Sequence, residues 1–141
     1  MRLRLALALL PVAVLTGCGS SAPSPESVVR AWSQELNSGD NEAAAKLFAH
    51  GARVVQAGTT IRLETEADAV AWNAALPCSG RLVSIETRGD TTRATFVLGD
   101  RQKSKCDGPG QRATAIVRVD KGKIVLWHQT EATPTTTGPT V

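Results

Sequence analysis

Hydrophobic positions change their spacing twice along this chain. Residues 5–15 form one apolar run behind Arg2 and Arg4. Between residues 28 and 36, apolar residues recur three or four positions apart, which is the spacing of an amphipathic helix, and further helix signals follow as far as residue 77. From residue 81 onward apolar and polar residues alternate, which is typical of half-buried strands. The pattern predicts a separate apolar segment at the N-terminus, then a mainly helical half, and then a half built of strands.

Three helices are expected in the helical half. The first follows the capping hydroxyl of Ser24 and ends at Gly39. A second is predicted over residues 41–49, with its buried side ending in a Leu-Phe pair. A third follows Thr65, whose spacing to an aspartate three residues later resembles a capping box, and it ends before Pro77.

Three hairpins are expected besides these helices. A small one covers residues 53–62, and two longer ones turn at Gly89 and at residues 120–123. Placing the turns at these positions sets which side chains lie opposite each other. The expected pairs are Val83 with Phe96, Ile85 with Ala94, Val119 with Ile124, Val117 with Leu126, and Ala115 with His128.

The N-terminal segment resembles a bacterial secretory signal. Its apolar run is about 11 residues long, whereas a membrane-spanning helix needs roughly 20. The run ends in Leu15, Thr16, Gly17 and Cys18, which resembles the lipobox of bacterial lipoproteins. That resemblance implies cleavage before Cys18 and attachment of lipid to its thiol. An uncleaved anchor and a cleaved signal without lipid are the alternatives.

The same resemblance divides the chain into segments. Residues 1–17 would be the signal peptide and residues 18–25 the lipidated cysteine with a flexible tether. Residues 26–131 form one domain of a size that can bury a core, and residues 132–141 form a Thr/Pro-rich tail that we expect to be disordered. The protein is expected on the extracytoplasmic side of the cell membrane, held there by the lipid on Cys18.

Charge excludes one class of partner. The chain has 16 basic and 13 acidic side chains, and the signal would remove two of the arginines. The remaining near-neutral domain has no net-charge signature of a nucleic-acid-binding protein, so no nucleic acid is expected as a partner.

Cys78 and Cys106 are the two cysteines left in the predicted exported domain. An even pair in an exported chain is most simply a disulfide, which would stabilise the fold by roughly 3–4 kcal/mol. Metal binding is the alternative, but His50 and His128 have no paired ligand spacing. Neither a metal nor another cofactor is expected.

The order of the elements resembles the nuclear transport factor 2-like superfamily, which includes SnoaL-like polyketide cyclases and ketosteroid isomerases. The residues that carry the likeness are 28–32, 37–40, 44–48 and 122–128. The resemblance implies an α+β, cone-shaped (cystatin-like) fold, in which about three N-terminal helices pack on a curved antiparallel sheet. It also implies a conical pocket and frequent dimers through the open face of the sheet. Catalytic members carry pocket carboxylates and often a tyrosine, but this chain contains no tyrosine.

Four side chains are candidates for function. In the expected register His128 shares the pocket face with Leu126, where an imidazole could act as a base; a strand-end histidine in contact with water is the alternative. Trp32 and Trp72 would line the cone as an aromatic wall, or pack in the core. Trp127 would lie on the opposite, open face of the sheet, where it could form a homodimer interface or be covered by the long loop.

These observations favour a lipid-anchored domain that binds a small apolar molecule or a partner protein without catalysis. Two alternatives remain: a small cofactor-free isomerase or cyclase that uses His128, and a structural dimerisation module.

Overall fold

A computed structural model describes residues 19–130 of the 141-residue chain. The predicted signal peptide (1–17), the predicted lipidation site Cys18 and the predicted tail (132–141) lie outside the described residues. Within the described part, no helix has the length and apolar character needed to cross a membrane.

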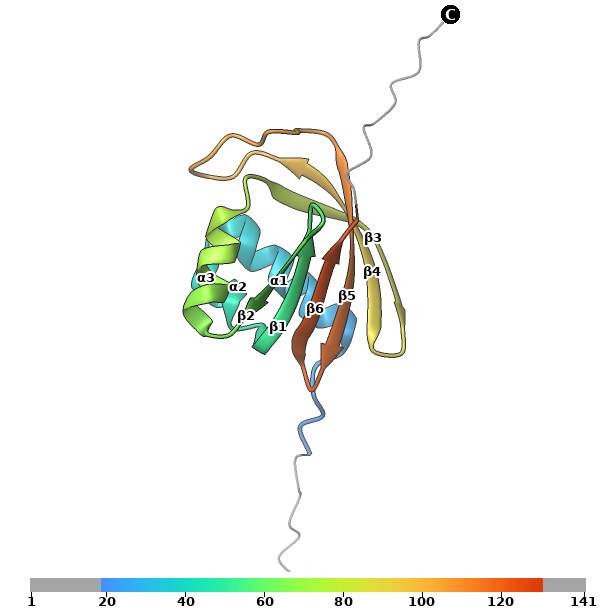
Figure 1. Ribbon diagram of the computed structural model, residues 1–141. Helices are drawn as coiled ribbons and strands as arrows, with labels where there is room; N and C mark the ends of the chain where they lie inside the picture. Colours follow the sequence, from blue (N-terminus) through green and yellow to red (C-terminus); the bar gives the residue numbers. More distant parts are fainter. Residues whose placement is uncertain (1–18, 131–141) are drawn as a thin grey trace, which may run out of the picture.

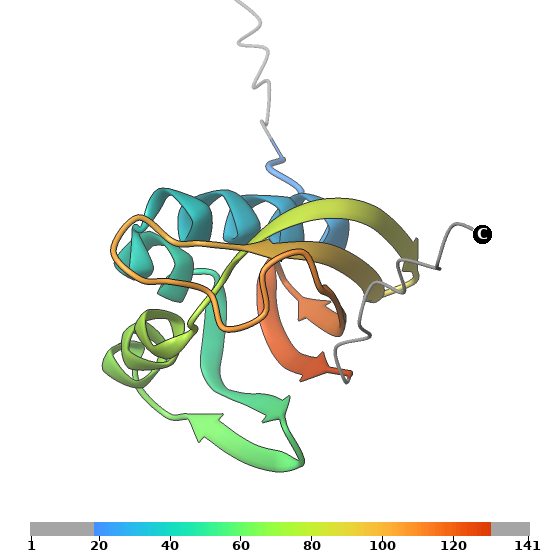
Figure 2. The same cartoon turned by 90° about the horizontal axis from the view of Figure 1, so that it is seen from above.

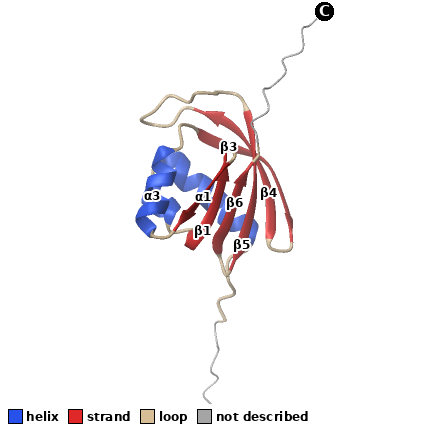
Figure 3. Ribbon diagram, in the orientation of Figure 1, coloured by secondary structure: helices blue, strands red, loops and turns tan. Residues whose placement is uncertain are grey.

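Three helices and six strands follow one another along the chain (Figures 1 and 3). The order is α1 (Pro25–Ser38), α2 (Asn41–Ala45), β1 (Phe48–Gln56), β2 (Thr59–Leu63), α3 (Glu66–Ala75), β3 (Ser79–Arg88), β4 (Thr91–Gly99), β5 (Arg112–Asp120) and β6 (Lys123–Gln129). This is the expected α+β class. The helices lie on one side of a curved sheet, as Figure 2 shows from above.

The capping predictions are confirmed. Ser24 accepts a hydrogen bond from the Ser27 amide at the start of α1, and Gly39 ends that helix in the left-handed conformation with φ 82°. Thr65 and Asp68 form the reciprocal capping box of α3. The second helix was predicted too long: α2 ends at Ala45, and the chain enters β1 at Phe48.

The six strands form one sheet in the order β2-β1-β6-β5-β4-β3. All neighbouring pairs are antiparallel except β1 and β6, which are parallel. The first hairpin therefore extends the sheet that the two longer hairpins form. The apolar stripe of α1 packs on β3, β4 and β5 and, with the concave side of the sheet, forms one core.

Two β-bulges alter the expected register. In β3 the predicted Ile85–Ala94 pair is confirmed. Val83, however, is an extra residue, so Leu82 lies opposite Phe96 in its place. In β6 the extra residue is Val125. Ile124 lies opposite Val119, and Leu126 lies opposite the adjacent Arg118. An extra residue reverses the faces of all side chains beyond it.

The bulge in β6 corrects two residue placements. Val119 lies opposite Ile124 as predicted, but Trp127 then pairs with Val117, and His128 pairs with Ile116. Trp127 is consequently buried in the core, where the sequence had indicated the open face. His128 is exposed on the open face, where the sequence had indicated the concave one.

Candidate functional site

A cavity of about 320 Å³ opens at the end of the concave side, between α1, the sheet and the loop that joins β4 to β5. A cavity of this size is at the lower end of the range for small-molecule sites. Its lining is largely apolar and comes from segments far apart in the sequence: Trp32, Leu36, Gln56, Leu76, Pro77, Cys78, Ser79, Gly80, Phe96, Leu98, Asp107, Gly108, Gln111, Ala113, Thr114, Ala115, Trp127 and Gln129.

Three aromatic rings contribute to the apolar wall. The rings of Trp32 and Trp127 have centroids 4.2 Å apart, and Phe96 meets Trp32 edge-on at 6.1 Å. Trp32 reaches this place because it belongs to the helical stripe of α1, and Trp127 because of the bulge in β6. The rings pack mainly against one another, and the small part of their surface that reaches the cavity is apolar.

The indole of Trp32 is held by a buried hydrogen bond. Its Nε1–H donates to Asn73 Oδ1 at 2.9 Å, and Asn73 in turn donates through Nδ2 to the Ala69 carbonyl at 2.8 Å. Asn73 is fully buried. By contrast, the Nε1–H groups of Trp127 and Trp72 are buried without a hydrogen-bond partner. Trp32 is therefore the fixed part of the aromatic wall.

Trp72 packs behind this wall. Its ring stacks at 6.3 Å from Trp32 and contacts Phe48 edge-on at 5.4 Å. It is not among the residues that line the cavity. Of the three predicted pocket residues, Trp32 lines the cavity, Trp72 supports it from the core, and His128 lies on the other face of the sheet.

Polar side chains occupy part of the cavity lining. Gln56 donates from Nε2 to Gln129 Oε1 at 2.9 Å, which ties β1 to β6 beside the cavity. Gln111 and Asp107 come from the β4–β5 loop. Among the described residues that line the cavity, Asp107 carries the only charge. The site therefore combines an aromatic wall with one exposed carboxylate that could accept a proton or attract a cation.

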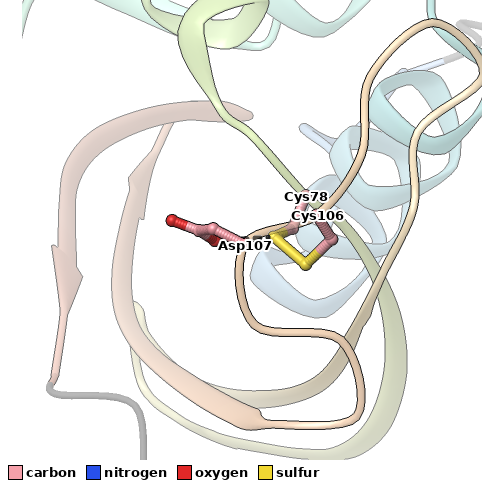
Figure 4. Close-up of side chains that lie close together, drawn as sticks. All are labelled: Cys78, Cys106 and Asp107. Atoms are coloured by element: carbon pink, nitrogen blue, oxygen red, sulfur yellow. Dashed lines mark hydrogen bonds between the residues drawn. A yellow bond between two sulfur atoms is a disulfide. The ribbon is translucent and has the colours of Figure 1, made fainter.

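The predicted disulfide is present and positions that carboxylate. Cys78 and Cys106 are bonded, with Cα atoms 4.5 Å apart. Asp107 follows directly, and its Oδ1 lies 3.3 Å from Sγ of Cys78, as the side chains drawn in Figure 4 show. These three residues form the one cluster of candidate metal ligands in the described chain. Because both sulfurs are in the disulfide, they provide no thiolate, so the cluster is a poor metal site.

The loop is also fixed at its start by a carboxylate. Asp100 Oδ1 accepts a hydrogen bond from the Cys106 amide at 2.9 Å. This hydrogen bond is the main reason why the pKa of Asp100 lies below its usual value. Desolvation opposes it, and the nearby charge of Lys105 lowers the pKa further. The bond ties the start of the loop to the disulfide.

Arg101 ties the same loop to the helices. Its Nη1 donates to the carbonyls of Asn73 at 2.7 Å and Leu76 at 2.9 Å, and its Nη2 donates to Asn41 Oδ1 at 2.7 Å. Partial burial lowers the pKa of this guanidinium. Arg101 thus caps the C-terminal end of α3, where Leu76 lines the cavity.

Sequence reasoning missed the residues of the β4–β5 loop and the glutamines. Asp107 stood in a stretch that looked like a solvated loop with charges of both signs. Its position directly after a cysteine was the available signal, because the disulfide brings the loop over the end of the sheet. Nothing in the spacing of Gln56, Gln111 and Gln129 indicates that they line one cavity.

Comparison with known proteins identifies the fold. No family model matches the sequence, and no curated protein matches it. Solved structures do match. A nuclear transport factor 2-like protein of unknown function from Cytophaga hutchinsonii superposes with a TM-score of 0.66 at 12% identity, covering 82% of this chain and 95% of that one.

Two further matches carry functional names. A candidate polyketide cyclase from Sinorhizobium meliloti has a TM-score of 0.60 at 16% identity and covers 74% of this chain and 94% of its own. A candidate ketosteroid isomerase from Kribbella flavida has a TM-score of 0.59 at 18% identity, with coverages of 84% and 86%. The chain has the nuclear transport factor 2-like, cystatin-like fold that its element order predicted.

Proposed function

We propose that this domain binds a small, largely apolar molecule in the cavity beside Trp32 and Trp127, and does not convert it. The aromatic wall is the observation that carries the proposal, because it is concave, apolar and bordered by a few polar groups. The apolar part of the ligand would contact the part of the indoles that reaches the cavity, and its polar end would point toward Asp107 and the glutamines.

We further propose that the protein acts on the extracytoplasmic side of the membrane, anchored by lipid on Cys18. The support is the tetrapeptide that ends in Cys18 and the disulfide, since disulfides persist in exported proteins. Partition between detergent and aqueous phases tests the anchor. The wild-type protein should enter the detergent phase, and Cys18→Ser should lower that fraction and remove the lipid mass from the N-terminal peptide.

A titration with a neutral apolar fluorophore, N-phenylnaphthylamine, tests the cavity. The wild-type domain should enhance its emission with saturable one-to-one binding. Ala113→Phe should abolish binding by filling the cavity, whereas Val97→Phe should preserve it, because Val97 lies on the open face of the neighbouring strand. Equal binding by both variants would refute the cavity as the site.

A second candidate is an enzyme of the isomerase or cyclase type. Two matching structures bear names of such enzymes, and Asp107 is a carboxylate at the cavity that could move a proton. His128, the base first considered, does not line this cavity. Asp107→Asn separates the two functions: an enzyme would lose turnover of its substrate, while a binding protein would keep its affinity for a neutral apolar probe.

A further inference from the structure

The open face of the sheet carries a concentration of arginines. On its central strands, Arg93, Arg112 and Arg118 are exposed, and they alternate with buried residues that face the core. Arg93 lies opposite Ile116, and Arg112 lies opposite Val97. Arginine and half-buried aliphatic side chains therefore share the middle of this face.

The flanking strands extend the same pattern. Arg81 and Arg88 lie on the open face of β3, since they pair with Val97 and Thr91. On the other flank, Arg53 of β1 lies directly opposite Arg62 of β2. All four are exposed.

Acidic residues compensate this charge only in part. Glu86 pairs across the sheet with Arg93, Asp90 lies 3.6 Å from Arg118, and Glu64 lies 3.8 Å from Arg62. Asp120, which shares the open face of β5 with Arg118, is also exposed and lies opposite Lys123. These four carboxylates face the seven arginines of the open face. Like charges placed directly opposite each other, as Arg53 and Arg62 are, destabilise a sheet. The near-neutral net charge of the domain thus conceals a strongly positive face.

The chemistry of this face fits phosphate. Except for Lys123 at the start of β6, opposite Asp120, the charged basic residues of its strands are arginines, and the other lysines of the described chain lie on loops and after α2. A guanidinium forms paired hydrogen bonds to phosphate oxygens, which an ammonium cannot do. An array of exposed arginines with aliphatic residues between them matches a surface of phosphate headgroups.

The chain also enters the domain at one end of the sheet, at the turn between β5 and β6. A side chain at Gly122, in the turn between β5 and β6, would lie 2.8 Å from Cδ of Pro23, and Figure 1 shows the start of the described chain at that turn. Pro23 is the fifth residue after Cys18, so the chain between them spans at most roughly 18 Å. A lipid on Cys18 would hold this end of the open face close to the membrane surface.

We propose that the open face of the sheet docks on the anionic phospholipid headgroups of the membrane. The domain would lie with its convex, arginine-bearing face on the bilayer and its cavity on the concave side, away from that surface. This membrane contact is separate from ligand binding in the cavity. The predicted lipid on Cys18 enters the proposal only as the reason why the open face would be close to the membrane. Because the sheet is curved, its central strands would make the closest approach.

The test measures binding of the unlipidated chain, from Gly19 to Val141, to vesicles. That chain contains every described element, and without lipid the face is tested independently of the anchor. We expect binding to vesicles of phosphatidylglycerol and phosphatidylcholine in equal parts, and none to phosphatidylcholine alone. Added salt should weaken the binding, because the Debye length falls to about 3 Å at 1 M.

Two triple variants with equal loss of charge locate the contact. Arg93→Gln with Arg112→Gln and Arg118→Gln should weaken vesicle binding roughly hundredfold, since each basic residue near an anionic surface contributes about 1 kcal/mol. The control removes three exposed charges elsewhere: Arg30→Gln, Lys103→Gln and Lys105→Gln. The control should retain binding within a few fold.

Three results would overturn the proposal. No binding to anionic vesicles by the folded wild-type chain would exclude the contact. Equal loss in both triple variants would assign the binding to net charge and not to this face. Equally tight binding to double-stranded DNA would indicate a general polyanion surface. Circular dichroism and an intact disulfide in each variant confirm that the comparison is made between folded proteins.

Discussion

Trp32 of the first helix lies against Trp127 of the last strand, with ring centroids 4.2 Å apart. The contact joins the two ends of the domain and provides part of the wall of its cavity. Because both rings are nearly fully buried, the same pair contributes to the core and to the candidate site. Variants of the two tryptophans can therefore separate stability from binding.

Replacing each tryptophan with phenylalanine should have unequal effects on stability. Trp32→Phe removes the donor to Asn73 Oδ1 and leaves that buried acceptor unpaired. Trp127→Phe removes an N–H that has no partner. We expect Trp32→Phe to cost about 1–3 kcal/mol more than Trp127→Phe. Urea unfolding with an unchanged m-value measures the difference, and equal losses would contradict the assigned hydrogen bond.

Removing the disulfide should destabilise the domain. Cys78 and Cys106 are 28 residues apart, and closing a loop of that length contributes about 3–4 kcal/mol. The double variant Cys78→Ser with Cys106→Ser should lose this amount in thermal or urea unfolding. Reductant should lower the stability of the wild type to a similar extent and leave the double variant unchanged. A wild type whose stability is insensitive to complete reduction would argue against the prediction.

Acid should weaken the loop through Asp100. The folded-state pKa of this carboxyl is lowered, mainly by the Cys106 amide, so its stabilisation is present above the unfolded pKa of about 3.9. It is lost as the pH falls through the lower folded-state value. Asp100→Asn should therefore be less stable than the wild type at neutral pH, and the difference should shrink at pH values below about 4.

The matched control for Asp100 is Lys105→Gln. Lys105 contributes less to the lowered pKa of Asp100 than the Cys106 amide does, and its side chain is 93% exposed. Its loss should reproduce only a small part of the pH dependence. If Lys105→Gln had the larger effect in urea unfolding across this pH range, the hydrogen bond would not be the main cause.

Arg101→Lys should behave as a disruptive substitution. An ammonium cannot reproduce the three hydrogen bonds that the guanidinium makes to α2 and the end of α3. We expect a loss of about 2 kcal/mol or more in urea unfolding, because hydrogen bonds to charged groups contribute about 1.5–3 kcal/mol each. Lys103→Gln, an exposed change two residues away, should alter stability by no more than about 0.5 kcal/mol. Similar effects of the two substitutions would disprove the anchoring role.

Local rules predicted most of the fold. Ser24, Gly39 and Thr65 marked helix ends through the orphan backbone groups that they satisfy. Gly89 and Gly122 marked turns, where both have positive φ. The order of these elements then resembled a known architecture, which the structural comparisons support.

The faces of two strands could not be predicted in the same way. In β6, Ile124, Val125, Leu126 and Trp127 are all apolar, so alternation does not reveal the extra residue of the bulge. That single residue exchanged the faces of Trp127 and His128. In β3 the same ambiguity surrounds Val83. A bulge depends on packing against the rest of the molecule, which a local pattern does not contain.

The candidate site was predictable only in part for a related reason. Trp32 followed from helical periodicity, because the stripe of α1 had to face the sheet. Asp107 and Gln111 lie in a loop, and their place at the cavity depends on the disulfide and on the contacts of Asp100 and Arg101. Those contacts connect distant parts of the chain.

Native mass spectrometry of the domain, produced in an oxidising compartment, tests the central claim most directly. The wild-type protein should carry an additional mass that is released on denaturation, because the cavity retains an apolar ligand from the host. The folded Ala113→Phe variant should lack that mass, and the Val97→Phe variant should keep it. An unliganded wild type that also fails to take up any member of a panel of small apolar molecules would contradict the account.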